Sequence, residues 1–329
     1  MVLANLVEMA KSRKSSDIHI IEGQAIYCRN HDGKIDILSD TPVSKTEVQV
    51  LFRDLITEDK AMLLKNNGDI DLASSFGDTR TRINIFREQN GLSAVIRLLQ
   101  GHIPTMNELR LPMTVQNLIN KDHGLILFTA ATGNGKTTSI ASMLQAISER
   151  HCKRIIMIED PIEYLHENNH SLFSQREVGR DVPDFATGLR SALREDPDII
   201  MIGEMRDRET ILSAIAAAES GHLVFSTLHS ADVIQATDRI LQYFPAGEQD
   251  TIQAQFANAF EAVVAQKLIP RKDKQGRVAA FEVLLKTDAT KNVIRSGNSY
   301  NLRGYMTLKD GMNTMDYSIS ELRRKGIIL

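Results

Sequence analysis

Cysteine is scarce in this sequence. The only two cysteines, Cys28 and Cys152, lie far apart, and neither belongs to a CxxC pair. A disulfide framework or a structural zinc site needs several cysteines at close, regular spacing. The sequence therefore predicts neither kind of site.

Long hydrophobic runs are also missing. The longest apolar stretches, such as residues 124–131 and 199–202, fall far short of the roughly 20 residues that cross a bilayer. The first residues lack the apolar segment of a secretory signal. We expect no transmembrane segment and a cytoplasmic location.

An excess of positive charge is the third absence. The 39 Lys and Arg residues face 42 Asp and Glu residues, which gives a net charge of −3. No overall basic field is available to hold a nucleic-acid backbone, and no aromatic platform on which bases would stack, so we expect no nucleic-acid partner. Local basic clusters at 11–14 and 271–274 are typical of solvated turns; the alternative is contact with acidic lipid head groups or a partner protein.

The first hundred residues have the pattern of a small α+β domain. Apolar residues recur at helical spacing over 3–14 and 44–65. Gly101, Pro104 and Pro112 then interrupt any regular element, so we expect a first domain at 1–100 and a linker at 101–112. Strands are expected at 17–21, 25–28, 69–74, 79–86 and 93–99, with a hairpin turn at 31–34.

Residues 113–329 show a different pattern, in which apolar strands alternate with helical segments. This alternation predicts an α/β domain built on a mainly parallel sheet that helices cover. A chain of 329 residues, 42% hydrophobic, is long enough for this domain beside the first. The expected strands are 124–130, 154–160, 198–203, 222–228 and 278–284.

A phosphate-binding loop occupies residues 130–137, between the first of these strands and a helical stretch at 138–150. Its glycines allow the backbone to curl around phosphates with the N–H groups inward. Lys136 supplies a charge for the β and γ phosphates, and the Thr137 hydroxyl a ligand for Mg²⁺. The usual first glycine of the motif is Ala130 here, a mild change at the strand end. The nucleotide-binding residues are predicted to be Thr132, Gly133, Asn134, Gly135, Lys136, Thr137 and Thr138.

Polar residues follow the later strands at their carboxyl ends, where ligands of open parallel sheets gather. Glu204 is the first choice for the base that activates water. Glu159 and Glu163 are candidates for holding the waters of Mg²⁺, and the sequence does not rank them. Helix capping and surface pairing are the alternatives for each acid. His229 is either a structural histidine or a group that senses the γ phosphate or links the site to a neighbour.

Several arginines are candidates for neutralising charge on the γ phosphate from a mobile or neighbouring domain. Arg82 lies on the strand at 79–86, Arg97 on the last strand of the first domain, and Arg194 on the helix at 184–195. A solvated face with surface ion pairs is the alternative for this group.

These motifs, taken in order, resemble the secretion and type IV pilus ATPase superfamily, and within it most closely the retraction motors of type IV pili. The phosphate loop is followed by IEDPIE at 158–163, DIIMIGEMRD at 198–207 and STLHS at 226–230. SDIH at 16–19 and RINIFR at 82–87 are similar to the family's first domain.

The choice of retraction rests on narrower features. Assembly and secretion members usually carry an extra N-terminal domain and a four-cysteine insertion, and this sequence has neither. The segments NVIRSG at 292–297 and KDGMNTMD at 309–316 resemble the tail of the retraction type, although Ser296 stands where an acid is common.

The resemblance implies a RecA-like ATPase core preceded by a smaller PAS-like domain. It also implies ATP and Mg²⁺ as cofactors, a homo-hexameric ring, and an inner-membrane platform protein at the pilus base as partner. The alternatives are an assembly or secretion ATPase of the same superfamily and, in another class, a nucleotide-gated scaffold that hydrolyses little.

Overall fold

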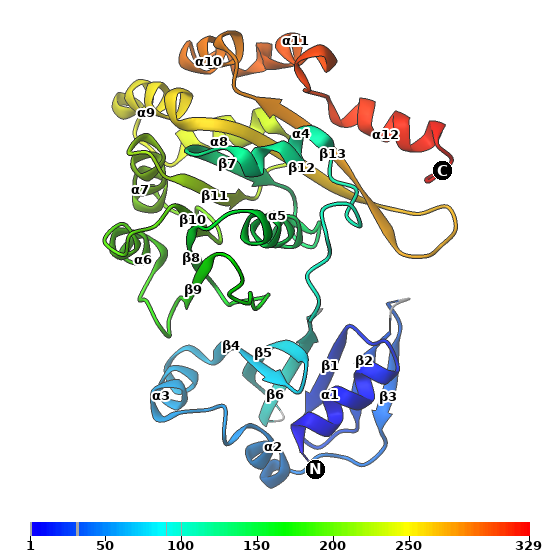
Figure 1. Ribbon diagram of the computed structural model, residues 1–329. Helices are drawn as coiled ribbons and strands as arrows, with labels where there is room; N and C mark the ends of the chain where they lie inside the picture. The colour runs from blue at the N-terminus through cyan, green and yellow to red at the C-terminus, as the bar shows by residue number, and fades with distance from the viewer. Residues whose placement is uncertain (1, 31–32, 90, 100) are drawn as a thin grey trace. The chain divides into compact units, whose positions relative to one another are not determined.

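The structure is a computed structural model that describes residues 2–30, 33–89, 91–99 and 101–329. The chain forms two compact units (Figure 1). The first comprises residues 1–102 together with 161–165, and the second comprises 103–160 and 166–329. Each unit is described separately below.

The first unit is a six-stranded sheet with strand order β3-β2-β1-β6-β5-β4, in which every neighbouring pair is antiparallel. Its core includes Leu6, Ile18, Phe52, Ile83 and Ile96, all fully buried. The elements are α1 (Leu3–Ser12), β1 (Asp17–Ile21), β2 (Ile26–Arg29), β3 (Ile35–Ser39), α2 (Lys45–Phe52), α3 (Glu58–Asn67), β4 (Asp69–Phe76), β5 (Thr79–Glu88) and β6 (Gly91–Leu98).

One detail of this unit differs from the sequence prediction, and a second prediction falls partly on residues that the structure does not describe. The helical pattern over 44–65 forms two helices, α2 and α3, each with its own N-terminal signal. Ser44 and Glu47 form a capping box that starts α2, and Gly68, at φ 88°, ends α3. The hairpin turn predicted at 31–34 includes His31 and Asp32, which lie outside the described residues.

The second unit is a seven-stranded sheet with strand order β13-β12-β7-β11-β10-β8-β9. Only the edge pair β12–β13 is antiparallel among these described strands, so the predicted α/β fold with a mainly parallel sheet is confirmed. The strands are β7 (Gly124–Thr129), β8 (Arg154–Glu159), β9 (Leu172–Glu177), β10 (Ile199–Ile202), β11 (Leu223–Leu228), β12 (Phe260–Pro270) and β13 (Arg277–Leu285). Strands β9 and β12 were not predicted from the sequence.

Helices cover both faces of this sheet (Figure 1). Leu125 and Leu127 of β7 pack on one face with α6 to α11, whereas Ile126 and Phe128 pack on the other with α4, η1 and α5. Alternating strand residues are apolar on both sides because both sides are buried. The helices are α4 (Met113–Gln116), η1 (Asn117–Asn120), α5 (Lys136–Arg150), α6 (Phe185–Ala192), α7 (Arg208–Glu219), α8 (Val233–Gln242), α9 (Ala246–Ala259), α10 (Asp288–Arg295), η2 (Ser299–Asn301), α11 (Leu302–Tyr305), η3 (Leu308–Asp310) and α12 (Met315–Arg324). None of the helices in the described part of the chain is long and apolar enough to span a bilayer.

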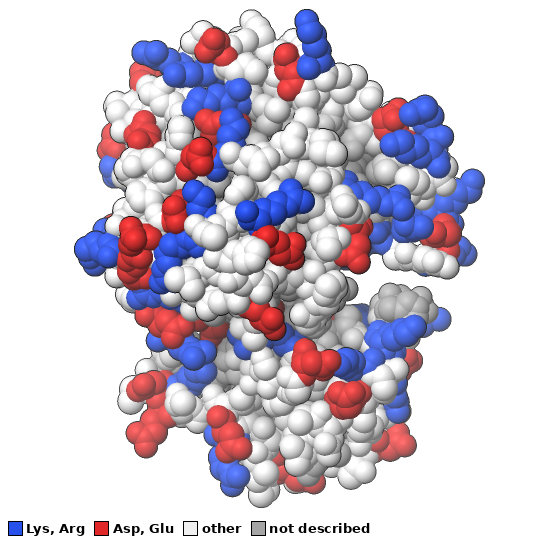
Figure 2. Space-filling model, in the orientation of Figure 1, with Lys and Arg blue, Asp and Glu red and all other residues white. Residues whose placement is uncertain are grey.

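Charge is unevenly distributed in the second unit. Residues 267–329, from within β12 onward, hold 13 Lys and Arg but only 6 Asp and Glu, whereas the rest of this unit holds 13 and 21. The backbone N–H of Lys272 donates to the carbonyl of Ile327 at 2.9 Å and joins the hairpin tip to the segment after α12. Figure 2 shows Lys and Arg side chains gathered on the side where Figure 1 draws these two segments.

Candidate functional site

The predicted phosphate loop lies between β7 and α5, at the carboxyl edge of the parallel strands. Gly133 and Gly135 have φ values of 77° and 80°, a left-handed conformation that favours glycine. Helix α5 begins at Lys136, so its unpaired N–H groups face the loop. The Lys136 ammonium is buried and donates to the Ala130 carbonyl at 2.9 Å, across the mouth of the loop. The arrangement is that of an anion cradle.

Side chains outside the motif hold this loop from behind. The Gln266 amide on β12 donates to the Asn134 carbonyl at 2.7 Å, and the Leu268 N–H donates to the Asn134 side chain at 2.9 Å. Arg277 on β13 donates to the Gly133 carbonyl at 3.3 Å. Gln266 and Leu268 were not predicted from the sequence because β12 itself was not, and Arg277 lies just before the strand predicted at 278–284.

A cluster of ionisable groups lies at the carboxyl ends of β10 and β11. The Glu204 carboxylate, only 16% exposed, is paired with Arg206 and lies 3.3 Å from His229 Nε2. Arg206 also reaches Asp160 after β8, at 3.3 Å. The structure therefore brings the predicted base and the predicted histidine together, and adds Arg206, to which the sequence had assigned no role.

The electrostatics of the cluster favour an ionised carboxylate. Burial raises the pKa of Glu204, but the hydrogen bond and charge of Arg206, with His229 and Lys136, outweigh burial and hold that pKa below its ordinary value. Burial and the charge of Lys136 lower the pKa of His229 despite the neighbouring carboxylate. His229 is thus a neutral donor to Glu204 near pH 7, and their contact is a hydrogen bond.

Hydrogen bonds between strand ends connect this cluster to the phosphate loop. The Thr129 hydroxyl, at the end of β7, donates to the Ser230 carbonyl at 2.8 Å and accepts from the Ser230 N–H at 3.0 Å. The Thr227 hydroxyl donates to the Gly203 carbonyl at 2.7 Å. The loop, Glu204 and His229 are consequently held in one framework.

A cleft of ≈ 750 Å³ opens beside the phosphate loop. It is lined by loop residues Ala131 and Thr132, by His229 and Ser230, and by side chains of α8 such as Arg239. The Ser230 hydroxyl is buried and has no hydrogen-bond partner among the described residues. A buried hydroxyl without a partner suits a polar ligand in this cleft.

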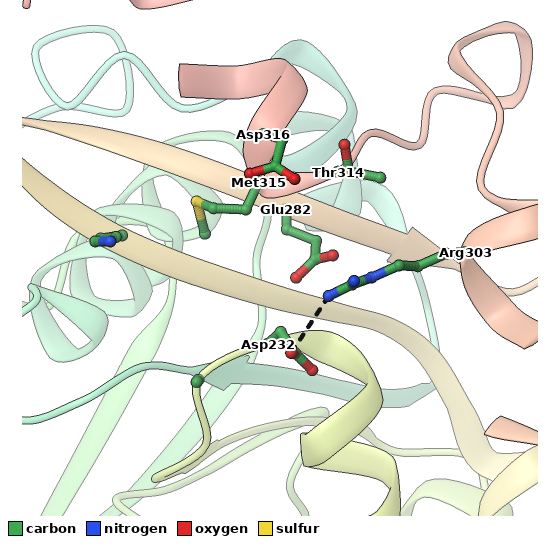
Figure 3. A pocket seen from close by; sticks show the side chains of 8 residues that line it. Asp232, Glu282, Arg303, Thr314, Met315 and Asp316 are labelled. Atoms are coloured by element: carbon green, nitrogen blue, oxygen red, sulfur yellow. Dashed lines mark hydrogen bonds and ion pairs between the residues drawn. The ribbon is translucent and has the colours of Figure 1, made fainter. Parts of the chain in front are cut away.

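A smaller cavity of ≈ 250 Å³ is lined by Ala231 and Asp232, which follow His229 in the chain, and by Glu282 and Arg303 (Figure 3). Arg303 of α11 pairs with Asp232 at 3.4 Å, and the Val233 N–H donates to the buried Glu282 carboxylate at 3.3 Å. Burial raises the pKa of Glu282. These contacts tie the C-terminal helices to the start of α8, four residues after His229.

The predicted metal-binding residues are placed as follows. Thr137 lies in the first turn of α5, and the buried Glu159 carboxylate accepts from Gln175 at 3.1 Å. Glu163 belongs to 161–165, which group with the first unit. In the described part of the chain, no three His, Cys, Asp or Glu side chains form a metal-binding group. Hydroxyl and carboxylate oxygens fit a Mg²⁺ ion that keeps most of its waters and is held mainly by phosphates.

The candidate arginines lie in both units. Arg82 of β5 and Arg97 of β6 face each other in the sheet register of the first unit. Each has an acidic partner, Asp71 at 2.9 Å and Asp17 at 3.0 Å. Arg194, in the second unit, donates to the Arg190 carbonyl at 2.9 Å. Arg82 and Arg97 form an adjacent pair in the first unit, and Arg194 belongs to the second unit.

The sequence profile of a family described as type II/IV secretion system protein matches residues 1–322. The chain belongs to this family. Its relatives include the uncharacterized protein YggR of Escherichia coli, 40% identical over 304 residues, which cover 92% of this chain and 91% of the relative. The type IV pilus retraction ATPase PilT of Pseudomonas aeruginosa is 36% identical over 333 residues, 100% of this chain and 96% of the relative.

A solved structure of a family member supports the same assignment. The crystal structure of the pilus retraction motor PilT with bound ADP superposes with a TM-score of 0.91 at 36% identity, covering 100% of this chain and 95% of that chain. The predicted resemblance to retraction motors is confirmed, and so is the predicted fold class of a RecA-like core preceded by a smaller PAS-like unit. The roles of individual site residues stay predictions.

Proposed function

We propose that this chain is an ATPase motor that powers the retraction of type IV pili. The observation that carries the proposal is the joint placement of a glycine-shaped phosphate loop and the Glu204–His229 pair at one sheet edge, in a member of this family. The similarity to a retraction ATPase over the whole chain supports the retraction role.

The residues divide the work of hydrolysis between them. The N–H groups of the loop and the Lys136 ammonium bind the β and γ phosphates. Glu204, ionised but a weak base, accepts a hydrogen bond from the attacking water and orients it, which suits a loose transition state. Neutral His229 donates to Glu204 and fixes the carboxylate. Mg²⁺ bound with ATP would neutralise developing phosphate charge, with Thr137, Glu159 and Glu163 holding it directly or through water.

The proposed motor is a homo-hexamer. Arg82, Arg97 and Arg194 would supply positive charge to the γ phosphate of a neighbouring copy. Residues 101–112 would act as the linker about which the two units move. The ring would work in the cytoplasm, at the inner membrane, against a platform protein at the pilus base.

The test measures ATP turnover against protein concentration, with and without Mg²⁺, together with the mass of the protein in solution. The expected result is Mg-dependent turnover whose specific activity rises as a hexamer-sized species forms. An Arg82→Ala variant should then lose turnover more than nucleotide affinity. Equal turnover by a monomer would contradict the shared-site ring, and no turnover at all would favour the nucleotide-gated scaffold.

An experiment in cells distinguishes a role in pilus retraction from a role in pilus assembly or secretion. A strain that assembles pili but cannot retract them is supplied with this chain or with its Glu204→Gln variant. Restored twitching motility with the unchanged chain alone supports the retraction role. Restored secretion or pilus assembly in the corresponding deficient strains would support the alternative.

A further inference from the structure

Gln266 is a buried polar side chain with contacts that the proposed hydrolysis does not use. It lies on β12, is 5% exposed, and is flanked in sequence by a run of apolar residues. Its Nε2 donates to the Asn134 carbonyl at 2.7 Å, and its Oε1 accepts from the Ser139 hydroxyl at 2.8 Å. The amide thus bridges the phosphate loop and the first turns of α5.

The direction of the amide is fixed by its two partners. The Asn134 carbonyl can only accept, so the neighbouring Gln266 atom must be the NH₂ group. The Ser139 hydroxyl donates to the remaining oxygen. A flip would place the amide oxygen against the Asn134 carbonyl, and two acceptors cannot bond to each other, so the buried amide holds one orientation.

This contact sets the direction of a phosphate-binding N–H. The Asn134 carbonyl and the Gly135 N–H belong to one planar trans peptide group, so they point in opposite directions. When Gln266 draws the carbonyl toward β12, the Gly135 N–H points away from β12, into the loop. Arg277, by donating to the Gly133 carbonyl, does the same for the preceding peptide group and the Asn134 N–H.

The absence of a side chain at Gly135 allows Gln266 to approach the loop. A Cβ atom there would lie 2.9 Å from Gln266 Nε2, too close for van der Waals contact. The glycine therefore serves the approach of the glutamine as well as the left-handed backbone.

We propose that Gln266 is a positioning residue for nucleotide binding, which aims the N–H groups of the phosphate loop at the phosphates from the strand behind it. The inference rests on the proposed function, because it requires a nucleotide in the loop. It adds a determinant of affinity on β12, a strand that the phosphate-loop motif does not include. Through the β12–β13 hairpin it also connects the loop to α12, since the Ser318 hydroxyl accepts from the Phe281 N–H at 3.0 Å.

The test compares Gln266→Met with Gln253→Leu. Gln253 is a matched control, because it is a buried glutamine of the same unit that donates to the Ile294 carbonyl and does not contact the loop. ADP and ATP affinities are measured by calorimetry on the full chain, and thermal stability is measured without nucleotide. Gln266→Met removes both hydrogen bonds of the amide, and loss of the one to the Asn134 carbonyl should weaken ADP and ATP binding by about tenfold, with a smaller change in turnover at saturating ATP. Gln253→Leu should lose stability but keep its affinities.

Three outcomes decide the matter. Wild-type affinity in Gln266→Met would overturn the proposal, and so would an equal loss of affinity in Gln253→Leu, which would show an effect of general destabilisation. If Gln266→Met does not fold, Gln266→Asn, a shorter neutral amide that no longer reaches the Asn134 carbonyl, gives the same comparison. A wild-type chain that binds neither ADP nor ATP would instead count against the proposed function.

Discussion

The two parts of the candidate site share a sheet edge but are stabilised by different forces. The buried contacts that hold the phosphate loop are neutral, through Gln266, Leu268 and Thr129, and the exposed Arg277 adds one contact from a charged side chain. The Glu204 cluster is held by ionisable side chains that are partly exposed, chiefly the charged Arg206 and the titratable His229. Neutral buried hydrogen bonds respond little to pH and salt, whereas exposed charges respond to both.

This difference assigns nucleotide binding to the phosphate loop and turnover to the Glu204 cluster. The loop is built to bind phosphates in a fixed geometry over a wide range of conditions. In the cluster, the charged neighbours of Glu204 lower the pKa of its carboxyl group, so their removal raises that pKa. Variants on one side should therefore change affinity, and variants on the other should change the rate and its dependence on pH.

The strongest test of the comparison is Glu204→Gln. The change keeps the size of the side chain but removes the charge that orients water, so turnover should fall by about a hundredfold or more, as for loss of a general base. ADP affinity, measured by calorimetry, should stay within about threefold because the loop is unchanged. Glu261→Gln is the control, since Glu261 pairs with Lys121 and Lys286 at the other end of β12. Unchanged turnover in Glu204→Gln would remove Glu204 from the mechanism.

Arg206→Ala should have the next largest effect, on the pH profile of turnover. Arg206 lowers the pKa of Glu204, so its removal leaves burial less opposed and that pKa rises. A carboxylate works only when ionised, so turnover should be lost at a higher pH on acidification than in the wild type. At neutral pH the rate should fall by about tenfold, the usual scale for one charged hydrogen bond. If Arg206→Ala loses turnover at the same acidic pH as the wild type, Arg206 does not have this role.

The smallest effect is expected from Thr129→Val, which breaks the link between the two parts. Valine keeps the shape but leaves the backbone groups of Ser230 without their partner, at a cost of about 1–3 kcal/mol in the free energy of unfolding. Turnover should fall by about threefold as the His229 segment loosens. Thr290→Val, at a buried threonine bonded to the Leu285 carbonyl, should cost similar stability without changing turnover. Equal turnover in both variants would show that the link has no catalytic consequence.

The comparison also shows which part of the site could be predicted from the sequence. The loop, Glu204 and His229 follow strands in local motifs, so the order of motifs along the chain was enough to predict their edge of the sheet. The partners that hold them come from distant segments. Gln266 is 132 residues from Asn134, and no spacing rule reports such a contact.

Two particular failures have physical reasons. Helix α9 passes directly into β12 at Phe260, without a glycine or proline between them, so the sequence has no turn signal at that boundary. The facing positions of Arg82 and Arg97 depend on the strand register, which pairing fixes and periodicity does not. One signal was available for Gln266, because a polar residue that directly follows an apolar run of a buried strand must find a partner when it is buried too.

The uneven charge of the second unit has a consequence for how this unit meets other molecules. With 13 basic and 6 acidic residues in 267–329, against 13 and 21 in its remainder, the unit is an electric dipole directed across its sheet toward the β13 edge. A dipole experiences a torque near any charged surface, even when its net charge gives little attraction. An anionic surface will therefore turn the hairpin tip and the end of α12 toward itself before contact, so that orientation precedes binding.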